Sequence, residues 1–266
     1  MAKRRRTAQF SSEADDDPIA WIQAKLREAA EPKYAVYLRG IIPKDVASPI
    51  MGVKVGFIHK LVAQLSDDAC EKTLHKVFFS KTAAPMENVF PYSLEERLVV
   101  AFIIGRVDAT FDRRVELIEA FLPWIDSWAV CDEFATVLKW RANERNELLD
   151  YISMCLARSE PYTIRFALVE IIKWFITPTM IDFVIESIET LAKRNLNERV
   201  VQTACSWTLT EAFVKFPETT MQYLRNNSLD DFTYNLTLRK IGDSLRVDLE
   251  TKLEIRNMTR PRKRGK

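Results

Sequence analysis

The clearest fold signal in the chain is the stretch Ser93-Leu-Glu-Glu-Arg-Leu-Val-Val-Ala-Phe-Ile-Ile-Gly105. Ser93 and Glu96 have the spacing of a capping box, in which each side chain bonds to the backbone N–H of the other residue at a helix N-terminus. Apolar residues then recur at helical spacing, namely Leu98, Val99, Phe102 and Ile103. Because this apolar run is far too short to cross a bilayer, we interpret the stretch as a core helix.

Similar helix signals recur along the chain at intervals of roughly 15 to 20 residues, and no strand-like alternation is sustained anywhere. The sequence predicts further helix starts at Ser66, Ser159 to Pro161, Thr177 and Pro178, Pro217, and Asp230 or Thr233. Only 6 of 266 residues are glycine, which is low for a sheet protein. About a dozen short helices with short loops predict an all-α fold, a HEAT-like helical repeat array or α-solenoid. Such arrays curve and bind extended partners on the concave side.

The excess basic charge lies in the two ends of the chain. The chain has 39 Lys and Arg against 37 Asp and Glu, but nine of the basic and only four of the acidic residues fall in the ends, so the body is slightly acidic. A polyanionic partner must therefore meet a segregated basic face and the ends. We predict one helical domain over residues 18–258, between a disordered N-terminal tail, residues 1–17, and a basic C-terminal tail, residues 259–266.

Cysteine and histidine usage argues against a metal site. The four cysteines show no Cys-x-x-Cys spacing and are predicted to be small buried side chains in a reducing compartment: Cys70, Cys131, Cys155 and Cys205. With only two histidines, a zinc site is not expected. The basic N-terminus is followed by polar and acidic residues instead of the apolar segment of a signal peptide. We expect a cytoplasmic protein without membrane contact.

An indole and a carboxylate share a helical face in Trp124-Ile-Asp-Ser-Trp-Ala-Val-Cys-Asp-Glu-Phe134. Trp128 and Asp132 are four residues apart and therefore stand one above the other if the stretch is helical. An unpaired buried carboxylate is costly, whereas an indole is out of place on a solvated face. Two interpretations follow: the rim of a helix interface, with the carboxylate reaching water, or a site for a flat, apolar or positively charged ligand.

Two further segments also place polar and aromatic groups together. Arg165 directly precedes an apolar run, and Trp207 has Glu211 four residues beyond it. Each also has a purely structural explanation, because Arg165 can pair with Glu160 or Glu170, and Trp207 can belong to the core.

Taken in order, these segments resemble the DNA alkylation repair family of HEAT-like DNA glycosylases. The resemblance extends from about Trp21 to about Met258 and excludes the tails. It is carried by five segments: residues 51–59, residues 93–97, residues 124–134, residues 162–166 and residues 201–217. It implies a curved helical protein that holds duplex DNA in a basic concave groove and excises positively charged N3- or N7-alkylated purines.

By this resemblance, Asp132 corresponds to the essential carboxylate of the family. Trp128 and Trp207 correspond to its two indoles, and Arg165 to its basic partner near the phosphate backbone. An alkylated purine is already a cationic leaving group, so Asp132 would stabilise the oxocarbenium-like sugar and position water. The resemblance also implies no base flipping, no metal or organic cofactor, and double-stranded DNA containing alkylated bases as the partner. We expect an elongated monomer that associates with the nucleoid when bound to DNA.

One residue departs from the family pattern. Thr210 stands where catalytic relatives tend to carry another basic residue, and the body is not basic overall. Both features weaken phosphate binding, because each phosphate contact adds salt-dependent affinity. Two alternatives therefore remain open. One is a noncatalytic HEAT-repeat binder of damaged or structured DNA, and the other is a protein–protein scaffold, which would need an apolar groove.

Overall fold

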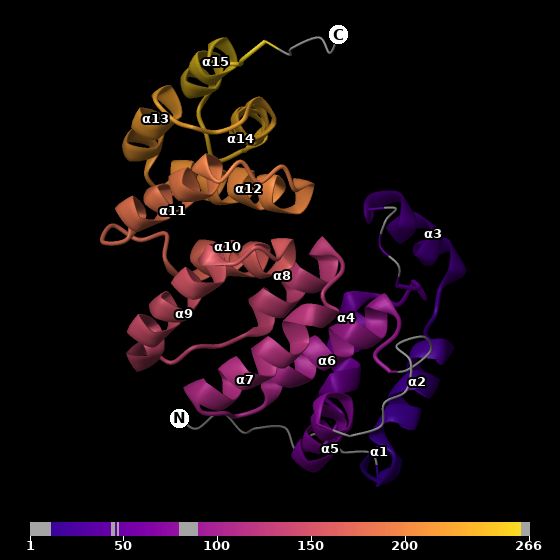
Figure 1. Ribbon diagram of the computed structural model, residues 1–266. Helices are drawn as coiled ribbons and strands as arrows, with labels where there is room; N and C mark the ends of the chain where they lie inside the picture. The colour runs from indigo at the N-terminus through magenta and orange to yellow at the C-terminus, as the bar shows by residue number, and fades with distance from the viewer. Residues whose placement is uncertain (1–11, 44–45, 47, 80–89, 262–266) are drawn as a thin grey trace, which may run out of the picture. The chain divides into compact units, whose positions relative to one another are not determined.

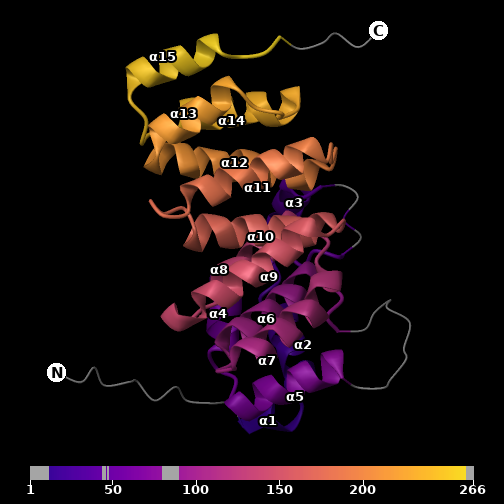
Figure 2. The ribbon, with the colours of Figure 1, turned by 60° about the vertical axis from the view of Figure 1, so that its left-hand side comes forward.

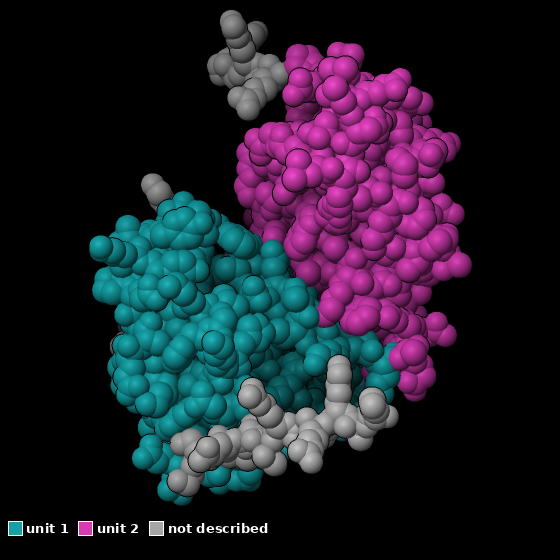
Figure 3. All heavy atoms as spheres, turned by 180° about the vertical axis from the view of Figure 1, so that it is seen from behind, with its two compact units in different colours: residues 1–141 teal, residues 142–266 magenta. Residues whose placement is uncertain are grey.

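The computed structural model describes residues 12–43, 46, 48–79 and 90–261, and their regular structure is helical (Figures 1 and 2). The chain divides into two compact units, residues 1–141 and residues 142–266 (Figure 3). Because no strand occurs within the described ranges, the predicted all-α class is confirmed there. The same part of the chain has no helix with the length and apolar character that a membrane span requires. All four cysteines are buried, as predicted.

The first unit contains eight α-helices in its described part. They are α1 (Ser12–Asp16), α2 (Pro18–Glu28), α3 (Pro32–Ile41), α4 (Val55–Val62), α5 (Asp67–Phe78), α6 (Leu94–Arg106), α7 (Phe111–Phe121) and α8 (Trp128–Val137). A single 3₁₀ turn, η1 (Leu122–Trp124), lies between α7 and α8.

The second unit begins with a 3₁₀ turn, η2 (Ala142–Glu144), and continues with seven α-helices in its described part. They are α9 (Arg145–Ala157), α10 (Pro161–Trp174), α11 (Ile181–Lys193), α12 (Arg199–Lys215), α13 (Pro217–Arg225), α14 (Asp231–Asp243) and α15 (Leu249–Asn257). Helix α10 packs against α12 and α12 against α14, while α9 lies on α10, α13 on α12 and α15 on α14. Figure 2 shows this succession of helices along the unit. The curved HEAT-like array with a concave groove stays a prediction.

Helix α6 is the centre of the first unit. The Ser93 hydroxyl accepts the Glu96 backbone N–H at 3.2 Å, and the Glu96 carboxylate accepts the Ser93 backbone N–H at 2.9 Å, so the predicted capping box is confirmed. From residue 94 to residue 104, every side chain except Arg97 is buried. A helix buried on all sides needs neighbours all round, and α4, α5, α7 and α8 supply them.

A buried carboxylate at the start of α6 fixes the segment that leads into α4. Glu95 is fully buried, and its carboxylate accepts the backbone N–H groups of Met51 at 3.0 Å, Gly52 at 2.7 Å and Val53 at 3.1 Å. These charge-assisted bonds satisfy the carboxylate. Gly52 has a φ of 85°, and a Cβ added there would lie 2.3 Å from the carbonyl oxygen of Glu31, so a side chain does not fit.

Most of the predicted helix starts are confirmed. Ser66 accepts a backbone N–H as the cap of α5, and Asp230 does the same for α14. Pro161 and Pro217 are the first residues of α10 and α13, where a missing N–H costs nothing.

The helix predicted to follow Thr177 and Pro178 is present, but these two residues do not form its cap and first turn. Helix α11 begins at Ile181, and its cap residue, Met180, makes no side-chain capping bond. Instead, the Met180 backbone N–H bonds to the Thr177 carbonyl at 3.1 Å, which closes a turn before the helix. Threonine and proline favour turns as well as helix starts, so this signal was ambiguous.

Two helices, α3 and α15, were not predicted from apolar periodicity. Helix α3 buries only Ala35, and α15 buries only Ile255. A single buried residue leaves no apolar periodicity to detect. Local chemistry does mark both starts, because Pro32 is the first residue of α3 and Asp248 accepts the Thr251 backbone N–H at 2.9 Å at the cap of α15.

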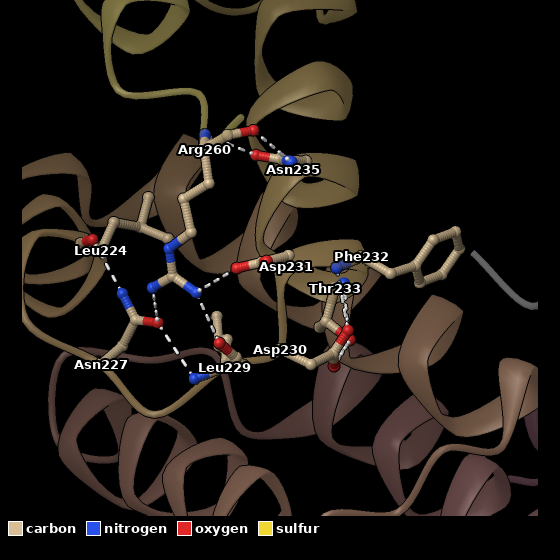
Figure 4. A network of polar contacts seen from close by, with 9 residues as sticks. All are labelled: Leu224, Asn227, Leu229, Asp230, Asp231, Phe232, Thr233, Asn235 and Arg260. Carbon is tan, nitrogen blue, oxygen red and sulfur yellow. Dashed lines mark hydrogen bonds and ion pairs between the residues drawn. The ribbon is translucent and has the colours of Figure 1, made fainter. Parts of the chain in front are cut away.

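The predicted tails lie partly outside the described residues, which omit residues 1–11 and 262–266. Within the described part, residues 12–16 form α1, and Arg260 is held by several bonds (Figure 4). Its guanidinium donates to the Leu229 carbonyl at 2.6 Å and the Asn227 side-chain oxygen at 3.0 Å. The Arg260 backbone and the Asn235 side-chain amide exchange two bonds of 2.9 Å. The chain is therefore fixed to α14 as far as Arg260.

Candidate functional site

Helix α8 holds two of the predicted site residues. The Ser127 hydroxyl accepts the Val130 backbone N–H at 3.3 Å and caps the helix, which makes Trp128 its first residue. One face of α8 is buried and the helix packs against α6; the buried residues are Val130, Cys131, Phe134 and Ala135. This packing fixes how α8 is rotated and therefore where Trp128 points.

The structure places Trp128 and Asp132 on α8 four residues apart, as predicted, and both side chains are half-buried. Positions i and i+4 of a helix lie one above the other. The indole and the carboxylate are thus neighbours at the edge of the buried face. Their roles in a reaction stay predictions.

Glu133 adds a second carboxylate beside Asp132, and the sequence did not single it out. Burial raises the pKa of Glu133, the nearby His59 opposes this increase, and the charge of Asp132 adds to it. The His59 ring of α4 stacks on Phe102 of α6 with centroids 3.9 Å apart and planes at 13°. His59 of α4 and Asp132 of α8 therefore both lie near enough to Glu133 to affect its pKa.

An ion pair anchors the segment before α8. Arg97 of α6 pairs with the Asp126 carboxylate, which also accepts a hydrogen bond of 2.5 Å from the Ser48 hydroxyl. The Arg97 and Asp126 side chains are 14% and 27% exposed, so solvent screens the pair only partly. Since Asp126 precedes the cap residue Ser127, this contact sets the position of the first turn of α8.

Helix α12 in the second unit carries Trp207, whose side chain is half-buried. Glu211, one turn further on, receives two N–H bonds from the Arg246 guanidinium, of 2.9 and 2.7 Å. The hydrogen bonds and the charge of Arg246 lower the pKa of Glu211 against the effect of burial.

Thr210, the residue that departs from the family pattern, supplies no positive charge. It is buried, and its hydroxyl donates to the Ser206 carbonyl one turn earlier at 2.7 Å. The Thr210 side chain is therefore part of the buried face of α12 and presents no charge to a ligand.

Arg165 is more buried than a surface phosphate contact would be, at 6% exposure. Its NH1 group donates to the Val200 carbonyl at 3.0 Å and the Thr203 hydroxyl at 3.1 Å, both in the first turns of α12. Arg165 thus ties α10 to the helix that carries Trp207, about two turns before the indole. Its contact with a phosphate stays a prediction.

The predicted site residues fall into two groups. Trp128 and Asp132 lie together on α8 of the first unit, while Arg165 and Trp207 lie on the packed helices α10 and α12 of the second. The described residues contain no cluster of three or more His, Cys, Asp or Glu side chains arranged to hold a metal ion.

A comparison with known proteins gives a match over most of the chain. A family model described as DNA alkylation repair enzyme matches residues 22–240, a range that includes α8, α10 and α12. None of the curated proteins compared with the chain matches it. The family match covers most of both units and all four predicted site residues. The chain therefore belongs to the DNA alkylation repair enzyme family.

Proposed function

We propose that this protein is a DNA glycosylase that excises positively charged N3- or N7-alkylated purines from duplex DNA. The observation that carries the proposal is the pairing of Trp128 with Asp132 on α8, both half-buried, in a member of a DNA alkylation repair family. A carboxylate beside an indole suits a site for a cationic ligand.

The chemistry requires stabilisation of a cation. Alkylation at N3 or N7 puts a positive charge on the purine, so the base can leave without protonation by a general acid. As the glycosidic bond breaks, positive charge develops on the deoxyribose, and the Asp132 carboxylate stabilises it. The same carboxylate then positions a water molecule for attack on the anomeric carbon.

The two indoles support this charge stabilisation. Trp128 lies one turn before Asp132, and Trp207 comes from α12. Each indole face contributes about 1 kcal/mol or more of attraction to a desolvated cation. Because neither residue has to enclose the base, the mechanism works without flipping the nucleotide out of the duplex.

Duplex binding is proposed to occur on the concave face of a curved HEAT-like array. Arg165 contributes to phosphate binding there, and its bonds to Val200 and Thr203 couple that contact to the position of α12. The reaction needs no metal or organic cofactor, and the protein acts as a monomer on alkylated double-stranded DNA.

The decisive experiment measures base release from duplex DNA that contains N7-methylguanine. Wild-type protein is expected to release the free base, and Asp132→Asn is expected to slow release at least about 100-fold, the usual effect of removing one stabilising group. Asp150→Asn, an exposed aspartate on α9, is the matched control and should release the base at the wild-type rate. Equal background release by wild type and Asp132→Asn would refute the assignment.

A noncatalytic binder of damaged or structured DNA is the second candidate, favoured by the buried, uncharged Thr210. It predicts retention of duplex binding in Asp132→Asn without base release by either protein. A gel-shift titration alongside the release assay separates the two functions.

A further inference from the structure

The Arg246 guanidinium and the Glu211 carboxylate form a two-pronged ion pair next to Trp207. NH1 donates to one carboxylate oxygen at 2.9 Å and NH2 to the other at 2.7 Å. Parallel bonds of this kind fix the geometry of both groups. Glu211 lies on α12, whereas Arg246 comes from the connection between α14 and α15, 35 residues along the chain.

This pair differs from the ordinary surface ion pairs of the same unit. The Glu211 side chain is only 19% exposed, and Arg246 covers it from the solvent side with 54% exposure. By contrast, Arg225 and Glu254 make one N–H contact of 2.7 Å with 64% and 49% exposure. Exposed single contacts of that kind contribute little, whereas a half-covered, two-pronged contact orders its members.

The indole of Trp207 lies one helical turn before this ion pair on α12. Glu211 is one helical turn beyond Trp207, so the two side chains lie one above the other on the same face of α12. The guanidinium thus fixes a carboxylate that lies beside the indole. A half-buried tryptophan has room to change rotamer, and an ordered neighbour on the same helical face limits the rotamers that its ring can adopt.

We propose that Glu211 and Arg246 are positioning residues that hold the Trp207 indole in the orientation needed at the alkylated nucleotide. This inference rests on the proposed function of Trp207. It adds a dependence of the site on the α14–α15 connection, which supplies Arg246 and which itself touches no reacting atom in the proposed mechanism.

The physical reason is that stabilisation of a developing charge depends steeply on placement. An indole that changes rotamer moves its ring face away from the sugar, and misplacement by about 1 Å can cost about 100-fold in rate. Support from a second layer of side chains prevents such movement. Arg246 provides this support from a separate element, so the indole does not rely on α12 alone.

The first test observes the indole directly and needs no activity. In protein with ¹⁵N-labelled tryptophan, the Nε1–H resonance of Trp207 is assigned from its loss in Trp207→Phe. Arg246→Met is expected to shift this resonance and broaden it, while Arg225→Met, which breaks the exposed pair on the same unit, leaves it unchanged. An unchanged Trp207 resonance in Arg246→Met would overturn the inference.

The second test follows the chemical step. Under single-turnover conditions with saturating protein, Arg246→Met and Glu211→Gln should lower the rate of N7-methylguanine release about tenfold, with duplex affinity within about twofold of wild type. Arg246→Lys keeps one charged donor and should recover part of the rate. Equal loss of rate in Arg225→Met, or loss of affinity alone in Arg246→Met, would contradict a positioning role.

The two proposals fail in distinguishable ways. If wild-type protein releases no base, the glycosylase function is wrong, whereas the resonance experiment still decides whether Arg246 orders the indole. If wild type releases the base and Arg246→Met neither shifts the resonance nor slows release, only the positioning role is wrong.

Discussion

Arg97 of α6 is ion-paired with Asp126, the residue before the cap of α8, so the core helix of the first unit directly holds the helix that carries Trp128 and Asp132. The site thus inherits the rigidity of α6, which is buried on nearly all sides. Catalytic geometry benefits from such rigid support.

Removal of this pair should weaken both the fold and the site. Arg97→Met removes one cation from beside the partly buried Asp126 carboxylate, which should cost about 2 kcal/mol of unfolding free energy, below the cost for a fully buried pair. Urea denaturation measures this loss, and base release should also fall because α8 is no longer anchored. Lys54→Met, which breaks an exposed pair with Glu31, is the control and should cost less than about 0.5 kcal/mol.

The two tryptophans should behave as site residues and not as core residues. Trp128→Ala and Trp207→Ala remove half-buried rings and should cost less stability than Phe134→Ala, a fully buried residue whose truncation costs about 3–5 kcal/mol. Base release should fall more than stability does. Melting curves and release rates for the three variants check this order, and a melting loss equal to that of Phe134→Ala would identify either tryptophan as core.

Glu95 should be one of the most sensitive polar residues of the first unit. Glu95→Gln replaces one of two acceptor oxygens with a donor, and so leaves backbone N–H groups of residues 51–53 without a partner. The expected cost is about 3 kcal/mol, as for buried unsatisfied groups. Glu116→Gln, on an exposed position of α7, is the matched control, and urea denaturation should show it near wild type.

The raised pKa of Glu133 predicts in which direction stability changes with pH. Its folded pKa is raised above the ordinary value, chiefly by burial, so its contribution to stability is complete below the unfolded pKa and is lost as the pH rises through the folded pKa. Glu133→Gln cannot ionise and avoids this loss. Thermal melts should therefore show the variant gaining on wild type between acidic and neutral pH, and a constant difference across that range would count against a raised pKa.

Local chemistry accounts for what could be predicted about the fold. Capping residues such as Ser93 and Ser66 act within one turn of the chain, so their helix starts are readable from neighbouring letters. Helix α3 escaped prediction because its buried face is a single residue, Ala35. The cap predicted at Thr177 was wrong because threonine and proline also favour turns, and a turn lies there.

In the candidate site too, contacts between sequence neighbours could be predicted, whereas contacts between distant residues could not. Trp128 and Asp132 were predictable as neighbours because helical spacing alone joins them. The contacts of Arg97 with Asp126 and of Glu211 with Arg246 join residues far apart in the chain, and no local pattern marks them. Arg165 shows what a motif cannot predict. The sequence predicts that Arg165 lies on a helix, but not that its guanidinium donates to the Val200 carbonyl of α12.

The bonds of Arg260 bear on how the chain can be handled at the bench. Because its backbone and its guanidinium are both fastened to residues around α14, a truncation that stops at Met258 would remove these bonds and uncover the Asn235 amide. A tag joined beyond Pro261 leaves them in place. The safe end for a shortened version of this protein is therefore Pro261, and not the last residue of α15.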